Sequence, residues 1–194
     1  MRYLPRLKTL LIATLVSTLP GTLPSSHALS VSSFGLSGGI SSPMGYQYQA
    51  FSQGWHVAGE LALSGLEFNP QLEPVFAFSY QDYNLRTVQT AGYHVSTVGF
   101  GLIAYGSAPS PKTGRTGIQP FFGTIVGAAV DWLTFNSTQL NPNASIGGSV
   151  QIQTGLSFTI GNSFELRAMS TLQGLFFTRS LFVFQPALGL RWRL

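Results

Sequence analysis

Residues 149–160 read SVQIQTGLSFTI, and this stretch decides the fold class. Its even-numbered positions are large and apolar except for Thr154, whereas its odd-numbered positions are Ser, Gln, Gly and Thr. Successive side chains of a β-strand point to opposite faces, so the stretch predicts a strand with one apolar and one small polar face. The polar face has no Lys or Glu, unlike the water-exposed face of a soluble sheet.

The same alternation continues on both sides of this stretch, interrupted by clusters of Gly, Pro, Asn and Ser. In each segment one face is apolar and the opposite face is mostly small. An apolar exterior around a small-residue interior predicts an all-β fold, an eight-stranded antiparallel up-and-down transmembrane β-barrel. Closure is required because an open sheet edge in hydrocarbon leaves backbone groups unpaired. The predicted strands are residues 30–41, 54–66, 74–81, 93–106, 118–134, 149–160, 164–176 and 183–194.

The composition also favours a membrane protein. Charged residues make up only 8% of the 194 residues, well below the roughly 25% typical of soluble domains. The chain has no cysteine, which excludes a disulfide scaffold, a lipoprotein anchor and thiolate metal sites. We expect no cofactor. Because no basic patch is interleaved with aromatic residues, we expect no nucleic-acid partner either.

The beginning of the chain has the layout of a secretory signal peptide. A positively charged start is followed by an apolar run at residues 10–19 and by small residues that end at Ala28. The apolar run is shorter than the roughly 20 residues that a membrane helix needs. An N-terminal anchor helix is the alternative. We therefore expect a cleaved signal peptide at residues 1–28 and a barrel domain at residues 29–194.

Six charged residues fall within the predicted strands, all on the small-residue face. Glu165 and Arg167 lie near the start of one strand, and Arg191 and Arg193 lie near the end of its antiparallel neighbour. Ion pairs between them would plug the lumen, because small barrels are filled by side chains. A gate or selectivity ring is the alternative interpretation. The predicted lumen charge cluster is Glu60, Asp131, Glu165, Arg167, Arg191 and Arg193.

Aromatic residues are expected to form two girdles, one at each membrane interface. If the odd-numbered strands run outward, both termini of the barrel lie in the periplasm. Residue 82 then falls in an outer loop and residue 73 in an inner turn. The predicted girdle residues are Trp55, Tyr80, Tyr93 and Trp132 at the outer interface, and Phe76, Phe122, Phe164 and Trp192 at the inner one.

On these features the chain resembles the small eight-stranded outer-membrane β-barrels of Gram-negative bacteria, including the OmpA-type membrane domain. The most specific feature is the C-terminus, where Leu188, Leu190, Trp192 and Leu194 alternate to the last residue. It is similar to the terminal signal that the barrel-assembly machinery reads in this family, although that signal usually ends in Phe. No peptidoglycan-binding domain follows, so the resemblance does not imply cell-wall anchoring.

The sequence leaves three functions open. The first is a non-enzymatic outer-membrane barrel with a filled lumen and a structural or surface-interaction role. The second is a narrow channel for small or hydrophobic solutes. The third, suggested by the family resemblance, is a lipid A-modifying enzyme that uses His94 and Ser96, which share one strand face. No acid lies at a matching position in the predicted strands, which favours a polar interfacial pair and the non-enzymatic function.

The resemblance also implies partners and a location. We expect a monomer in the outer membrane that contacts lipid and the secretion and barrel-assembly machineries. The sequence does not identify a ligand for the extracellular loops.

Overall fold

The computed structural model describes residues 29–45, 50–65, 69, 71–86, 91–106, 117–135, 139–140, 144–161 and 163–194. The expected signal peptide lies outside the described residues. Among the described residues, no helix is long and apolar enough to cross a membrane. The strands are β1(Ser30–Pro43), β2(Gly54–Ser64), β3(Leu72–Asn84), β4(Ala91–Tyr105), β5(Ile118–Phe135), β6(Gln139–Leu140), β7(Ser145–Ile160), β8(Phe164–Phe176) and β9(Ser180–Arg193).

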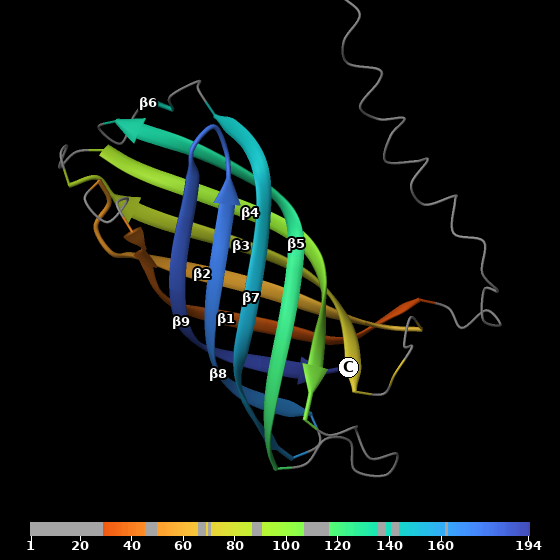
Figure 1. Cartoon of the computed structure of the whole chain (residues 1–194). Coiled ribbons are helices and arrows are strands. Elements are labelled where there is room, and N and C mark those ends of the chain that lie inside the picture. The colour runs from red at the N-terminus through yellow and green to blue at the C-terminus, as the bar shows by residue number, and fades with distance from the viewer. Residues whose placement is uncertain are drawn as a thin grey trace, which may run out of the picture.

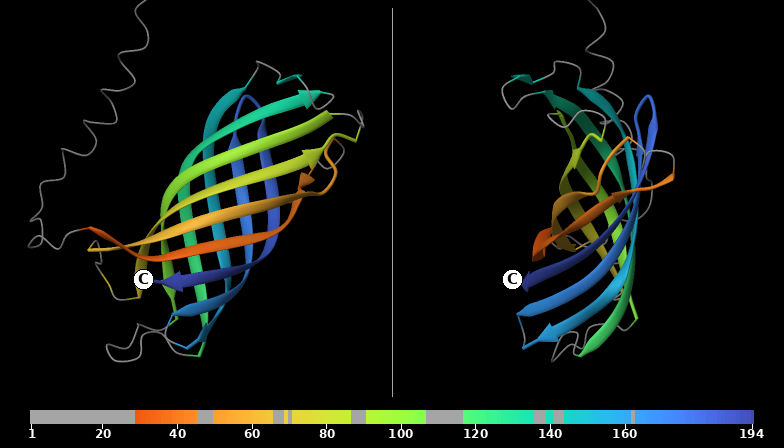
Figure 2. Two further views of the ribbon diagram at one scale, coloured as in Figure 1. Left: turned by 180° about the vertical axis from the view of Figure 1, so that it is seen from behind. Right: turned by 90° about the vertical axis from the view of Figure 1, so that its left-hand side faces the viewer.

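Eight of the described strands close into an antiparallel barrel, as the sequence predicts (Figure 1). Each barrel strand pairs with the barrel strands that precede and follow it, so that β5 pairs with β7, and β1 pairs with β9 to complete the ring. Among the described residues, the two-residue strand β6 pairs only with the end of β5 and adds a short hairpin outside the ring. Figure 2 shows that β1 begins and β9 ends at the same end of the barrel. We call this the proximal end and the opposite one the distal end.

The strands lie where the alternation predicts them, but several are longer. Strand β3 spans 13 residues and includes Glu73 and Asp82, which the sequence analysis had assigned to connections. This prediction is wrong because Pro74 and polar residues such as Asp82 are typical of turns, whereas here they continue the strand. Strand β7 also begins earlier, at Ser145. Each barrel strand has at least the length needed for a tilted crossing of the bilayer, about 9–11 residues.

The apolar face of each strand forms the outside of the barrel. In β7, Leu156 is 44% exposed, whereas its neighbour Ser157 and the nearby Gln153 are buried in the interior. In β9, Leu188 and Leu190 point outward while Arg191 is buried. Alternate burial along every barrel strand therefore assigns one face to the surroundings and one to the lumen.

The ladder that closes the barrel is interrupted near its middle. Strands β1 and β9 pair at Gly39 with Ala187 and resume at Ser42 with Phe184. Pro186 lies in this interval and has no N–H to donate to the ladder. A Cβ atom on Gly39 would collide with the Pro186 carbonyl oxygen, so this close approach requires glycine.

The interior is packed in layers along the barrel axis. Charged side chains fill the proximal end, next to an apolar layer on β2 to β5 that includes Val75, Ile103, Phe121 and Ile125. Glutamine, serine and threonine side chains occupy the middle. A second apolar layer fills the distal end and consists of Tyr83, Tyr93, Val95, Ala129, Leu175, Leu181 and Val183.

Candidate functional site: the closed lumen and the outer wall

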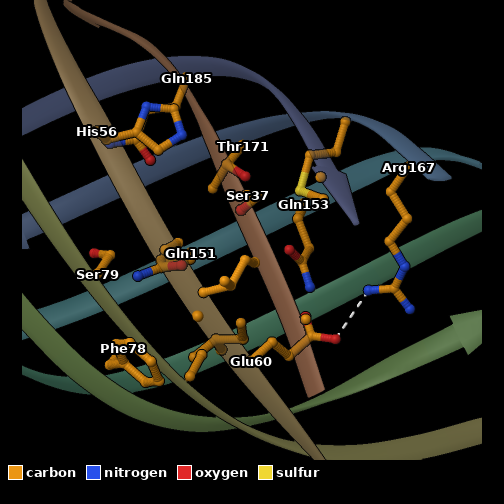
Figure 3. Close-up of a pocket in the computed structure, with 18 of the residues that line it drawn as sticks. Ser37, His56, Glu60, Phe78, Ser79, Gln151, Gln153, Arg167, Thr171 and Gln185 are labelled. Carbon is orange, nitrogen blue, oxygen red and sulfur yellow. Dashed lines mark hydrogen bonds and ion pairs between the residues drawn. The ribbon is translucent and has the colours of Figure 1, made fainter. Parts of the chain in front are cut away.

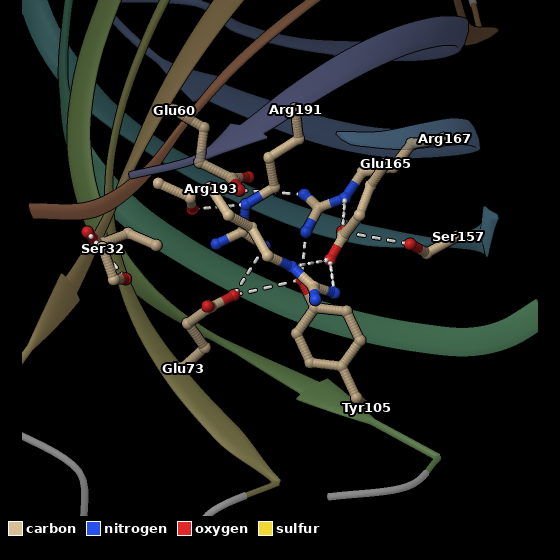
Figure 4. Close-up of polar contacts among 11 residues, drawn as sticks. Ser32, Glu60, Glu73, Tyr105, Ser157, Glu165, Arg167, Arg191 and Arg193 are labelled. Carbon is tan, nitrogen blue, oxygen red and sulfur yellow. Dashed lines mark hydrogen bonds and ion pairs between the residues drawn. The ribbon is translucent and has the colours of Figure 1, made fainter. Parts of the chain in front are cut away.

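The structure brings together five of the six residues predicted for the lumen charge cluster at the proximal end (Figure 4). Glu73 and Tyr105 join them, although the sequence analysis had not included either residue. The resulting proximal network is Glu60, Glu73, Tyr105, Glu165, Arg167, Arg191 and Arg193. Its three guanidinium groups balance its three carboxylates.

Arg191 lies at the centre of the proximal network and is only 2% exposed. Its Nη1 lies 2.7 Å from Glu73 Oε2, and its Nε donates to Ser33 Oγ at 2.5 Å. It also donates a hydrogen bond to the Tyr105 hydroxyl, which in turn donates to Glu73 Oε2 at 3.0 Å. The phenol thus connects a buried cation with a carboxylate whose side chain is only 15% exposed.

Arg167 connects the opposite sides of the lumen. Its Nη1 donates to Glu60 Oε1 at 2.9 Å, and its Nη2 donates to the Tyr105 hydroxyl. Its guanidinium carbon lies 5.1 Å from the centroid of the Phe121 ring, within the range of a cation–π interaction. Since β2 and β8 are not neighbours in the sheet, the Glu60–Arg167 pair crosses the lumen rather than following its wall.

Glu165 is 1% exposed and has two cationic partners. Arg193 Nη2 lies 2.5 Å from Glu165 Oε1, and Arg167 Nε lies 3.5 Å from Glu165 Oε2. Ser157 Oγ donates to Glu165 Oε2 at 3.1 Å. Burial of a carboxylate is costly unless it is paired and hydrogen-bonded, and here both oxygens have partners.

Asp131 does not belong to the proximal network, contrary to the prediction. It lies on β5 at the distal end, where Tyr93 Oη donates to its Oδ2 at 2.7 Å and Ser145 N donates to its Oδ1 at 3.0 Å. The error arose because the alternation of β5 gives the face of a residue but not its depth in the barrel.

The middle of the lumen is polar and almost filled. Figure 3 shows the side chains around a cavity of about 50 Å³, among them Ser79, Gln151 and Gln185. Hydrogen bonds link neighbouring side chains in this layer, such as Gln81 Nε2 with Gln173 Oε1 at 2.6 Å. A cavity of this size holds at most a few water molecules.

Tyr93 points into the lumen, so its assignment to the outer girdle was wrong. It is 8% exposed and packs against Tyr83 and Phe51, with ring centroids 6.2 and 4.9 Å away. The reason is that the distal end reverses the expected pattern: its lumen is apolar, and polar side chains occupy the outward positions next to it.

The other predicted girdle residues lie on the outward face. At the distal end, Trp55, Tyr80 and Trp132 form one row of aromatic rings, with centroids 5.4 and 6.1 Å apart. At the proximal end, Trp192 packs against Phe34 and Phe164. The outward residues also include Phe76, Phe122, Leu188, Leu190 and Leu194, which are 39%, 52%, 66%, 45% and 81% exposed.

His94 lies on the outward face within a hydrogen-bonded cluster that the sequence did not reveal. Its Nδ1 is 2.8 Å from Tyr80 Oη and 3.2 Å from Asp82 Oδ1, and its Nε2 is 2.8 Å from Thr134 Oγ1. The expected absence of an acid near His94 was therefore wrong. Within the described part of the chain, we find no hydrogen bond between His94 and Ser96.

Three residues of these sites were missed for different reasons. Glu73 and Asp82 were assigned to connections because β3 was predicted too short. Tyr105 was not assigned to either face, although it continues the inward series of Ile103 in β4. Extending the period-two pattern past the turn-like residues would have found all three. In the described residues, no group of three or more His, Asp or Glu side chains could hold a metal ion.

Comparisons with known proteins agree with this architecture. No protein-family model and no curated protein sequence matches the chain. The structure is similar to Neisserial surface protein A, with 12% sequence identity, a TM-score of 0.66, and coverage of 87% of this chain and 100% of that one. It is also similar to Ail, the attachment invasion locus protein of Yersinia pestis, with 14% identity, a TM-score of 0.50, and coverage of 85% and 100%. The chain therefore has the fold of the small eight-stranded outer-membrane β-barrels.

Proposed function

We propose that this protein is a non-enzymatic integral outer-membrane barrel whose closed lumen serves as a rigid support for a structural or surface-interaction role. The observation that carries the proposal is the filling of the lumen at both ends. A charge-balanced network fills the proximal end, and an apolar layer crosses the lumen near the distal end, where a pocket of about 430 Å³ opens. A cavity of about 50 Å³ lies between the network and the layer. A narrow channel would need a continuous open polar path, which the apolar layer interrupts and which the paired side chains of the proximal network occupy.

The proposal includes export by a signal peptide at residues 1–28 and a monomeric barrel at residues 29–194 with periplasmic termini. The secretion and barrel-assembly machineries would act on the chain before it reaches the lipid. The outward series Leu188, Leu190, Trp192 and Leu194 would serve as the terminal assembly signal. The regular outward alternation of these residues along the last strand supports this role.

Two measurements on the same preparation test the proposal. In the outer-membrane fraction, unboiled protein should migrate differently from boiled protein on a denaturing gel, because the closed barrel resists detergent. In planar bilayers, the folded protein should give no single-channel steps. Well-defined conductance steps would instead establish the narrow channel, and a protein confined to the soluble fraction would overturn the membrane assignment.

A second candidate function, modification of lipid acyl esters, is supported by one observation at His94. Thr134 Oγ1, the His94 ring and the Asp82 carboxylate follow one another at 2.8 and 3.2 Å. This is the order of nucleophile, base and orienting acid used in covalent catalysis. Mass spectrometry of lipid A from cells with wild-type, Thr134→Val or Ser96→Ala protein tests it. A lipid A acyl pattern that changes with Thr134→Val would establish the enzymatic activity. Identical acyl patterns in cells with and without the protein would support the non-enzymatic function.

A further inference from the structure

Four outward residues at the distal end stand opposite one another on adjacent strands. Trp55 of β2 pairs with Asp82 of β3, Asp82 pairs with His94 of β4, and His94 pairs with Trp132 of β5. They form a cross-strand row on the face that carries Phe76, Phe78 and Val98 further along the barrel. We call Trp55, Asp82, His94 and Trp132 the distal row.

The carboxylate of Asp82 is unusual on this face. A charged side chain on the lipid-facing side of a barrel costs free energy unless an opposite charge or a hydrogen-bond donor compensates it. In the described part of the chain, the only ion-pair partner of Asp82 is His94, whose Nδ1 also contacts Tyr80 Oη. Asp82 keeps 29% of its side chain exposed, against 14% for His94. The exposed part of the Asp82 carboxylate can therefore accept hydrogen bonds from a group outside the barrel.

Aromatic residues lie along the same face as Asp82. Trp55 is 48% exposed, and its ring lies 5.4 Å from that of Tyr80, which lies 6.1 Å from that of Trp132. Ring faces of Trp and Tyr carry negative potential and attract cations, above all where water is excluded. A carboxylate beside such rings is complementary to an ammonium group. The distal row itself contains no Arg or Lys, and Arg86, four residues after Asp82, donates its Nε to the Phe51 carbonyl oxygen at 3.1 Å.

We propose that the distal row binds the primary ammonium of a lipid headgroup, with Asp82 as the charge partner and Trp55 and Trp132 as flanking rings. The proposal rests on the insertion of the barrel in a membrane, as stated under the proposed function, because only then does the outward face meet lipid. The partner of this part of the surface would be the ammonium group of the lipid. Its binding requires neither a conducting lumen nor a reaction at His94.

Native mass spectrometry of the full folded barrel tests the proposal. The protein is released from micelles that contain equal amounts of phosphatidylethanolamine and phosphatidylglycerol, and the retained lipid is identified. We expect the wild type to retain phosphatidylethanolamine preferentially. Asp82→Asn keeps the shape but removes the charge, and it should lower this preference roughly tenfold, the usual worth of a charge-assisted hydrogen bond. Asp131→Asn, which removes a lumen carboxylate at the same end, should leave the preference unchanged.

Several results would overturn the proposal. Equal retention of the two lipids, or a preference that survives Asp82→Asn, would remove the role of the carboxylate. Loss of the preference in EDTA would show that a divalent cation bridges Asp82 to a lipid phosphate. If free ethanolamine displaces phosphatidylethanolamine, the ammonium group alone suffices for binding. If it does not, the acyl chains of the lipid also contribute to binding. Both results support the ammonium site. The boiled and unboiled gel of each variant reports separately on barrel formation.

Discussion

At the proximal end of the lumen, Arg191 and Glu73 are held by ion pairs and by the Tyr105 hydroxyl, whereas at the distal end Leu175 and Val183 are held by packing alone. Both ends exclude water, but they respond differently to the loss of one side chain. Removing an ion from a balanced buried network leaves its partner charged and unpaired, whereas removing an apolar group leaves a cavity. The proximal end should therefore be the more sensitive to single substitutions.

Arg191→Met should give the largest effect. The variant removes the guanidinium that lies 2.7 Å from Glu73 Oε2 and leaves the proximal network with three carboxylates and two guanidinium groups. We expect the free energy of unfolding to fall by about 3–5 kcal/mol, the usual cost of breaking a buried ion pair from one side. Urea unfolding in detergent micelles measures it. The double variant Arg191→Met/Glu73→Gln should recover most of the loss; no recovery would show that Arg191 contributes by packing rather than by its charge.

Leu175→Ala tests the distal end. Leu175 is completely buried among apolar side chains, so its truncation creates a cavity that costs about 2–5 kcal/mol. Leu172→Ala, three positions earlier in β8 and 43% exposed on the outward face, is the matched control and should cost less. The Leu175→Ala loss should not change with salt concentration. If the two alanine variants are equally stable, the distal layer does not pack as a core.

Leu156→Arg and Gln153→Arg separate the lumen from the lipid-facing wall, on which the comparison of the two ends depends. Leu156 points outward, and an Arg there costs about 2–4 kcal/mol at the middle of the bilayer. Gln153 points into the polar middle of the lumen, so its replacement should be far better tolerated. The amount of heat-modifiable protein in the outer-membrane fraction measures assembly. Equal amounts for both variants would contradict the assignment of the two faces.

The fold could be predicted from the sequence because period-two alternation depends only on the geometry of a strand. Once eight segments each show one apolar face, closure follows from the need to pair every backbone group in hydrocarbon. The lumen-facing positions of Glu165 and Arg191 also follow, because the alternation persists to the ends of β8 and β9.

The distal sites could not be predicted in the same way. The rule that apolar side chains point outward fails where Tyr93 and Val95 fill the lumen and Asp82 and His94 face outward. The contacts between side chains of different strands also depend on the strand register and on the depth of each residue in the barrel. The sequence separates Asp82 from His94 by a connection, whereas the register of β3 and β4 places them side by side.

The smallest expected effect comes from removing a single hydroxyl at each end, with Tyr93→Phe and Tyr105→Phe. Both variants keep the ring and its packing, so they compare the polar contacts alone. Within the described part of the chain, Tyr93 Oη donates to Asp131 alone, and Asp131 keeps the Ser145 N–H, so we expect a loss of about 1.5 kcal/mol. The Tyr105 hydroxyl accepts from two guanidinium groups and donates to Glu73, so its loss should cost about 3 kcal/mol. Urea unfolding of both variants measures the difference. Equal losses of stability would mean that the proximal charges are satisfied without the Tyr105 hydroxyl. The two ends would then differ in composition, but the stability of each would depend equally on its tyrosine hydroxyl.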